Sequence, residues 1–303
     1  MPAVKKLYQS SATNSKAPYI FGPAFQARGL WACGPLGHPL CVPLTSRSHE
    51  GVGFSNRARR TLSDQFAQLF LTVVAEREQG VRVVVAAYYA SRKVRCPLLM
   101  VGHQVLTRVR CKAVAYSPAL PPSQRRRGRP RVYGQKARLQ ELGSRHRKQC
   151  HSAPSPVSGE SQGRLRYFAL DLLWRPVGQL VRFVLVDHPR RGRVIWRSTD
   201  RAMTPLQIVA GYRYRVKLAV AFKQALDTLG PSAYHFWLKP MCPLSRRSGN
   251  PYLPRHSPSY RRQGRRKLEA YPRYVHLGCL AQGLLQYLAL SFRAELWRSC
   301  RSW

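Results

Sequence analysis

The spacing of apolar residues in the first half of the chain predicts alternating helices and strands. Apolar residues recur at helical spacing over residues 60–78, which is typical of an amphipathic helix. The run VRVVVAAYYA after Gly80 is rich in β-branched residues and predicts a buried strand that ends near residues 86–89. A helix over residues 91–100 and a strand over residues 104–110 are expected next. This order of elements favours an α/β sheet.

The second half of the chain opens with three strand-like runs at residues 165–174, 179–187 and 193–198, separated by turn-forming proline and glycine. These runs predict an antiparallel meander. A helix over residues 205–229 should follow, because Thr204 is a suitable N-cap and proline is favoured in the first turn of a helix.

The most apolar stretch near the end, LGCLAQGLLQYLALSF at residues 277–292, belongs to a last helix expected over residues 265–292. Two glutamines interrupt this stretch, so it reads as a buried helix rather than a membrane span, and no membrane partner is expected. The N-terminus has no apolar core after its lysines, which argues against a secretory signal and favours an intracellular protein. The eight cysteines contain no C-x-x-C pair and are expected to be free thiols.

The charge of the chain has the largest effect on the expected function. The chain has 303 residues, with 52 Lys and Arg against 12 Asp and Glu, and a formal net charge of +40. Nucleic acid is the commonest partner of such a field, because each neutralised phosphate releases a counterion. Compositional drift toward arginine is the alternative explanation, since net charge alone does not define a fold.

Residues 118–164 are rich in proline, serine and arginine and are predicted to be a linker or insertion. Within them the run RRRGRPR resembles an AT-hook, whose core slides into a narrow minor groove. Arg127, Arg129 and Arg131 are therefore candidate DNA-binding residues. An exposed basic linker that contacts only phosphates explains the run equally well, and both interpretations bind DNA.

The helix predicted at residues 205–229 carries a spaced set of residues on one face: Tyr212, Arg215, Ala219 and Lys223. Tyr, two residues, Arg, three residues and then an acid is the pattern of DDE-type transposases of bacterial insertion sequences, which this chain resembles. The family's glutamate falls on Ala219. The family's lysine seven residues later is Leu226 here, although Lys223 lies one turn after Ala219.

A second match is VVVAAYYASRK, which resembles the strand end of the same family. The aspartate of that motif falls on Ala86. The other positions are filled as the pattern requires, by Tyr88, Tyr89, Arg92 and Lys93. The resemblance extends over most of the chain. Three further segments have sequences similar to the family: SHEGVGFSNRARRTL, YFALDLLWRPVGQLVRFVLVDHPRRGR and YHFWLKP.

The resemblance implies an RNase H-like α/β fold, a mixed sheet flanked by helices with a β-rich insertion. Residues 1–117 would form its first part, residues 118–164 a basic linker, and residues 165–303 the rest of the same domain. The family's first aspartate lies on an early central strand that would precede Met1, so the chain is expected to be truncated and to lack that strand.

The resemblance also implies a function. Active members use two aspartates and a glutamate to hold Mg²⁺ for phosphodiester cleavage and strand transfer. With alanine at both positions, no catalytic residue is intact, and no metal ligand or cofactor is expected. The chain is therefore expected to be an inactive, cytoplasmic, nucleoid-associated protein that binds transposon-end DNA. An active enzyme that uses Asp171 or Asp187 instead, and a general basic nucleic-acid-binding protein, are the alternatives.

Overall fold

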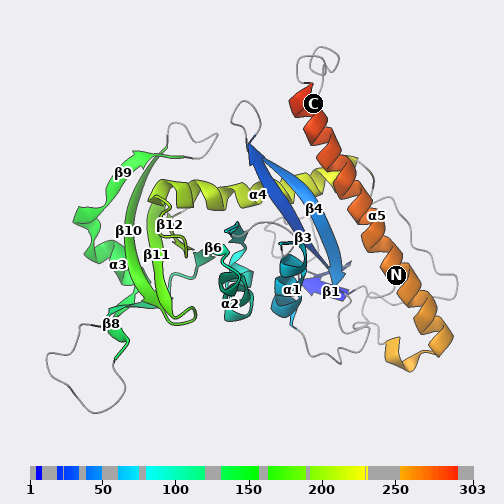
Figure 1. The fold of residues 1–303 in the computed structure, drawn as a ribbon, viewed down its shortest axis with the longest axis horizontal. Coiled ribbons are helices and arrows are strands. Elements are labelled where there is room, and N and C mark those ends of the chain that lie inside the picture. The colour runs from blue at the N-terminus through cyan, green and yellow to red at the C-terminus, as the bar shows by residue number, and fades with distance from the viewer. Residues whose placement is uncertain are drawn as a thin grey trace. The chain divides into compact units, whose positions relative to one another are not determined.

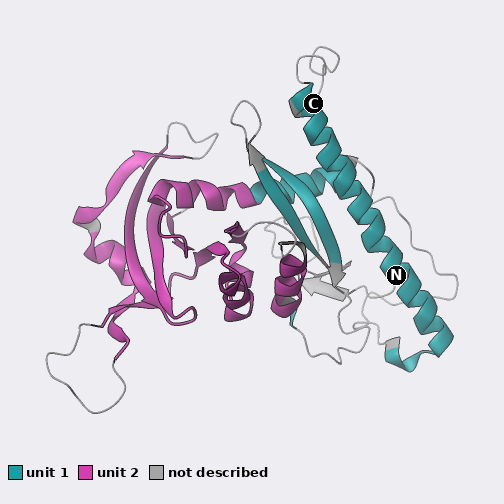
Figure 2. Cartoon of the chain, in the orientation of Figure 1, with its two compact units in different colours: residues 1–62, 216–303 teal, residues 63–215 magenta. Residues whose placement is uncertain are grey.

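The computed structural model describes residues 5–8, 19–22, 24–33, 39–49, 61–74, 80–119, 131–156, 163–188, 192–228, 230 and 253–292. The chain divides into two compact units (Figure 2). Unit 1 contains residues 1–62 and 216–303, and unit 2 contains residues 63–215. The long helix α4 (Pro205–Thr228) runs from unit 2 into unit 1.

Unit 2 is built on one eight-stranded mixed sheet in the part of the chain that the structure describes (Figure 1). Its strands are β5 (Arg82–Val85), β6 (Gln104–Val109), β7 (Val114–Pro118), β8 (Tyr133–Arg138), β9 (His151–Pro154), β10 (Arg164–Trp174), β11 (Gln179–His188) and β12 (Gly192–Ser198). Their order is β5-β6-β12-β11-β10-β7-β8, and β9 pairs with β10. Among the described strands of this sheet, β5 and β6 pair in parallel and the other pairs are antiparallel.

Helices cover both faces of this sheet. They are α1 (Leu62–Val74), η2 (Ala87–Tyr89), α2 (Arg92–Met100), α3 (Leu139–Arg145), η3 (Arg147–Gln149) and the first half of α4. Alternate residues of β6 point to opposite faces, so Val105 packs in the cluster with α1 and α2, whereas Leu106 packs with α4. The predicted α/β class, with a mixed sheet flanked by helices, is confirmed at this level.

The predicted meander is confirmed as β10, β11 and β12. Strands β10 and β11 pair from Arg166 with Asp187 to Trp174 with Gln179. The turn between them ends at Gly178, whose φ of 77° is readily adopted only by glycine. The predicted helices over residues 60–78, 91–100 and 205–229 correspond to α1, α2 and α4; residues 60, 75–78 and 229 of these predictions lie outside the described residues. The predicted strand after Gly80 stops at Val85, and residues 87–89 form a 3₁₀ turn instead.

Part of the segment predicted as a linker or insertion, residues 118–164, is folded: its residues 131–156 carry two strands of the sheet and a helix. Strand β8 pairs with β7, β9 pairs with β10, and α3 lies between them in sequence. Two leucines anchor this segment, because Leu139 and Leu142 are buried in the cluster around Phe183. Burial of these two side chains gives an otherwise polar, basic segment enough apolar contact to fold onto the sheet.

Unit 1 contains two antiparallel strand pairs in its described part. The first joins β1 (Lys5–Tyr8) and β2 (Tyr19–Gly22), and the second joins β3 (Ala24–Cys33) and β4 (Pro39–His49). A 3₁₀ turn, η5 (Leu253–Arg255), precedes the helix α5 (Pro258–Ser291), which packs against β4. Val275, Cys279 and Gln282 form the buried side of α5.

The expectation of a buried last helix starting at residue 265 is wrong in two respects. Helix α5 begins at Pro258, where Ser257 accepts a hydrogen bond from the Tyr260 backbone N–H at 3.3 Å. Its apolar stretch is also largely exposed: Leu277 and Leu284 are more than half exposed. Only one side of α5 meets β4, so the opposite apolar side is left outside the described core of unit 1.

Candidate nucleic-acid interface

The end of β5 carries the first motif. Ala86 follows the strand, is half-buried, and accepts a hydrogen bond from the Tyr89 backbone N–H at 2.9 Å. Tyr88 points outward and is 65% exposed, whereas Tyr89 stacks on Phe66 of α1 with ring centroids 4.2 Å apart. Of the two tyrosines, the tight turn therefore presents Tyr88 to solvent, whereas Tyr89 has a packing role.

The two basic residues of this motif begin α2, and both are exposed. Lys93 forms an ion pair with Asp64 of α1, with Nζ 2.9 Å from Oδ2. Arg92 extends from the first helical position after the turn. Its guanidinium is thus available at the same edge of the sheet as Tyr88.

The second motif lies along α4. Tyr212 is half-buried against the cluster on that face of the sheet, with its ring centroid 6.2 Å from that of Trp196. Arg215 lies over the Tyr212 ring, with Cζ 5.7 Å from its centroid. Further along the same helix, Ala219 and Lys223 are exposed.

One apolar cluster connects the two motifs within unit 2. Val84, two residues before Ala86, packs against this cluster from β5, and Tyr212 packs against it from α4. Gly211 allows this close approach, because a Cβ there would lie 3.1 Å from the side chain of Leu106. Of the AT-hook candidates, Arg127 and Arg129 lie outside the described residues, and Arg131 is exposed at the start of the next described segment.

The carboxylates considered in the sequence analysis as alternative metal ligands are held by arginines. Asp171 on β10 accepts from Arg182 at 2.9 and 3.0 Å, and Arg201 donates to it at 3.3 Å. The hydrogen bond from Arg182 holds the pKa of the Asp171 carboxyl below its ordinary value. Asp171 is therefore a structural ion-pair partner in this fold.

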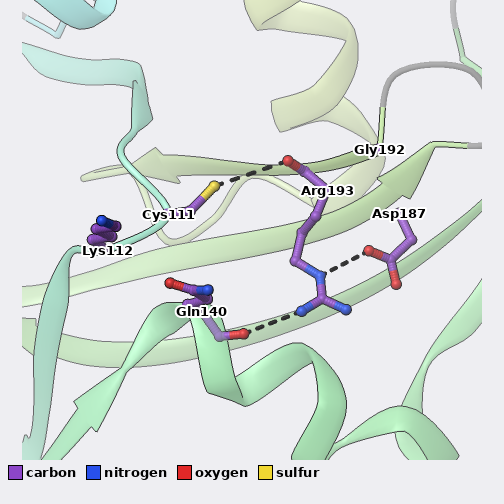
Figure 3. A pocket seen from close by; sticks show the side chains of 6 residues that line it. All are labelled: Cys111, Lys112, Gln140, Asp187, Gly192 and Arg193. Atoms are coloured by element: carbon purple, nitrogen blue, oxygen red, sulfur yellow. Dashed lines mark hydrogen bonds and ion pairs between the residues drawn. The ribbon is translucent and has the colours of Figure 1, made fainter.

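Asp187 lies in a shallow pocket lined also by Cys111, Lys112, Gln140, Gly192 and Arg193 (Figure 3). The guanidinium of Arg193 lies between two acceptors there. Its Nε donates to the Asp187 carboxylate at 3.0 Å, and its Nη1 donates to the Gln140 carbonyl at 3.1 Å. Asp200 is held in the same manner by Arg82, at 2.7 Å, and also accepts from the Ala202 backbone N–H.

The residues at the motif positions do not fit a divalent metal. Mg²⁺ requires oxygen ligands, whereas Ala86 and Ala219 offer only methyl groups. Within the described ranges, no group of three or more His, Cys, Asp or Glu side chains converges as a metal site would need. The nearby acids already neutralise arginines.

The Asp171 ion pair leads to a pH-dependent prediction. Because its pKa is depressed in the folded protein, its stabilisation is complete above the unfolded pKa of about 3.9 and is lost as the pH falls through the folded value. Asp171→Asn should lower the free energy of unfolding by about 1–3 kcal/mol at pH 7, a typical range for charged hydrogen bonds. The wild-type advantage should shrink toward zero in acid, as measured by urea unfolding across pH. If the difference in free energy of unfolding between the wild type and Asp171→Asn stayed constant as the pH was lowered, this role would be contradicted.

A set of basic residues at the start of α5 was not recognised as a candidate site, because the predicted helix began at residue 265 and left Arg261 and Arg262 outside it. Arg261, Arg262, Arg265 and Arg266 are all exposed on the first turns of the helix. The signal that could have found them is Ser257-Pro258, an N-cap followed by proline at the first helical position.

The described elements thus define a mixed α/β protein with basic, aromatic-flanked surfaces. No known family model matches the chain, and no curated protein is significantly similar to it in sequence. None of the helices in the described segments is long and apolar enough to cross a membrane.

Proposed function

We propose that this chain is a transposase-like DNA-binding protein with an RNase H-like core that does not cleave DNA. Three features support the proposal: a parallel β5–β6 pair joined through α2, two motif segments packed against one apolar cluster, and a net charge of +40. The first two are compatible with the mixed sheet and the pair of motif segments that the transposase resemblance implies. The third favours a polyanionic partner.

The observation that carries DNA binding is the exposed arginine group at the start of α5, Arg261, Arg262, Arg265 and Arg266. Residues four apart on a helix are neighbours, so these guanidiniums repel each other. Arg261 also lies in the first turn, at the positive end of the helix macrodipole, where a cation costs about 0.3–1 kcal/mol and no acidic residue compensates it. Such an arrangement opposes helix stability and suits a phosphate backbone, which would relieve both repulsions.

The absence of cleavage follows from the side chains at the motif positions. Metal-assisted transfer needs carboxylates that hold the ions in place, and two of the family's three positions are alanine. The alternative enzyme would recruit Asp171 or Asp187. Each of these would first have to break its ion pair with Arg182 or Arg193, which makes the alternative unfavourable.

Two measurements on the full chain test the proposal. Fluorescence anisotropy with a short random duplex should show binding whose log affinity falls steeply and linearly with log salt. Supercoiled plasmid incubated with Mg²⁺ or Mn²⁺ should remain intact. Absence of binding at low salt would refute the DNA-binding role. Nicking that disappears in Asp171→Ala or Asp187→Ala would instead establish the displaced-acid enzyme.

A transposase-like role predicts preference for a particular duplex. Binding selection from a randomised duplex pool should enrich one sequence over the random background at physiological salt. Equal affinity for every duplex would support a general nucleic-acid-binding protein and would contradict descent of function from an element-specific transposase.

A further inference from the structure

Two arginines are buried in the interior of unit 2. Arg197 on β12 is 0% exposed, and Arg95 on α2 is 2% exposed. Both lie against the indole of Trp174 on β10, with Cζ atoms 5.2 Å and 5.9 Å from the ring centroid. The three side chains come from separate elements of the sequence, so the fold creates this cluster.

The cluster lies between two apolar groups on one face of the sheet. Val105 belongs to the group under α1 and α2, and Val109 belongs to the group around Phe183. Thr107, which is also fully buried, lies between these valines on β6 and directly opposite Arg197 in the strand pairing. The two buried arginines, Arg95 and Arg197, thus interrupt an apolar core that is otherwise continuous.

Five nitrogens of this cluster lack a hydrogen-bond acceptor among the described residues. Arg197 Nε, Nη1 and Nη2, Arg95 Nη1 and Trp174 Nε1 are all buried without a hydrogen-bond partner among the described residues. Arg95 has one, because its Nε donates to the Ser91 carbonyl at 3.2 Å, and the Ser91 hydroxyl is itself buried and unpartnered. Several buried N–H groups are therefore hydrogen-bond donors without an acceptor among the described residues.

No carboxylate of the described core balances these charges. Asp171 is paired with Arg182 and Arg201, and Asp200 is paired with Arg82. Burial lowers the pKa of Arg95 to about 10, which still leaves its guanidinium protonated at neutral pH. The cluster is a site of concentrated positive charge inside the protein.

The Trp174 ring does not compensate for this burial. Even a desolvated cation–π contact recovers less free energy than the removal of an ion from water costs after relaxation. The proximity of a second guanidinium adds repulsion. An additional negative charge is required to make the arrangement favourable, and the chain does not provide one in the residues described.

We propose that Arg95, Arg197 and Trp174 form an internal binding site for a small inorganic anion of the chloride class. The unpartnered N–H groups supply its donors, and the two guanidiniums supply its charge balance. A guanidinium is weakly hydrated and suits an anion that loses water easily, which favours chloride or bromide over fluoride. Because the site is buried, a DNA phosphate does not enter it, and the site is independent of the proposed nucleic-acid interface.

Anion binding should appear as anion-dependent stability of the full chain. Urea unfolding is measured at fixed ionic strength while chloride or bromide replaces fluoride. Above the dissociation constant, each tenfold rise in free chloride should lower the unfolding constant about tenfold. The double variant Arg95→Met and Arg197→Met should lose this response, and apolar replacements at buried charges are commonly tolerated in folding.

The control is Arg108→Met with Arg110→Met, which removes the same charge from exposed positions and should keep the response. An equal response in the buried double variant would overturn the proposal, as would a wild-type protein that does not distinguish chloride from fluoride, since water would then satisfy the cluster. If the double variant does not fold, bromide-soaked crystals of the wild type decide the question. An anomalous peak beside Arg197 and Trp174 supports the site, and its absence refutes it.

Discussion

Glutamine in place of Arg261, Arg262, Arg265 and Arg266 is expected to weaken DNA binding by the full chain by ~100-fold or more at 50 mM salt. These four side chains are exposed on the first turns of α5. Each phosphate that is no longer neutralised should reduce the slope of log affinity against log salt by about 0.9. Stability should change little or improve, because the substitution removes repulsion among neighbouring cations. Anisotropy across a salt series measures affinity and slope together.

A matched control separates a local interface from bulk charge. Arg108, Arg110, Lys136 and Lys148 are exposed on unit 2, and replacing them by glutamine removes the same four charges. If α5 forms the interface, this variant should bind nearly as tightly as the wild type. Equal losses in the two variants would show that net charge governs binding and that α5 has no special part in it.

The elements that the sequence predicted well share a strong local pattern. Strands β10, β11 and β12 are bounded by turn-forming residues, and α4 has an N-cap threonine followed by proline. In each case the signal lies within the element itself, so no knowledge of distant contacts was needed. Strand β5 was similarly evident from its run of β-branched residues, whereas its parallel pairing with β6 was not predicted.

The elements that the sequence analysis did not predict depend on contacts with segments that are distant in sequence. The segment at residues 131–156 is polar and basic, and two leucines that meet the sheet around Phe183 hold it in place. The exposed apolar side of α5 could not be anticipated either, since a run of leucines in sequence does not reveal how many sides of a helix find a partner.

The candidate sites likewise divide into residues that the sequence identified and residues that only the structure revealed. Sequence motifs singled out Tyr88, Arg92 and Tyr212, and also the two alanines at positions where the transposase pattern has acids. They gave no indication of Arg95 and Arg197, because an arginine in a basic chain reads as a surface residue. Only the fold reveals that these two are buried against one tryptophan.

Truncation of Phe183 should produce the largest loss of stability. Phe183 is fully buried in β11, lies opposite Leu170 and Arg197 in the neighbouring strands, and contacts Trp174 with ring centroids 5.3 Å apart. Phe183→Ala should lower the free energy of unfolding by about 3–5 kcal/mol, because it removes apolar contact and leaves a cavity. That is a large part of the roughly 5–15 kcal/mol typical of a folded domain.

Urea unfolding measures the loss, and hydrogen exchange of the β10–β12 amides assigns it to unit 2. The control is Phe168→Ala, since Phe168 is only half-buried and stacks on His146 with ring centroids 4.7 Å apart. Because Phe168 is less buried than Phe183, Phe168→Ala should lower the free energy of unfolding by clearly less. Equal losses, or a loss below about 1 kcal/mol for Phe183→Ala, would contradict a core centred on β11. Because Phe183 also supports Trp174, its loss should weaken the chloride response of the buried arginine cluster as well, whereas Phe168→Ala should leave that response intact.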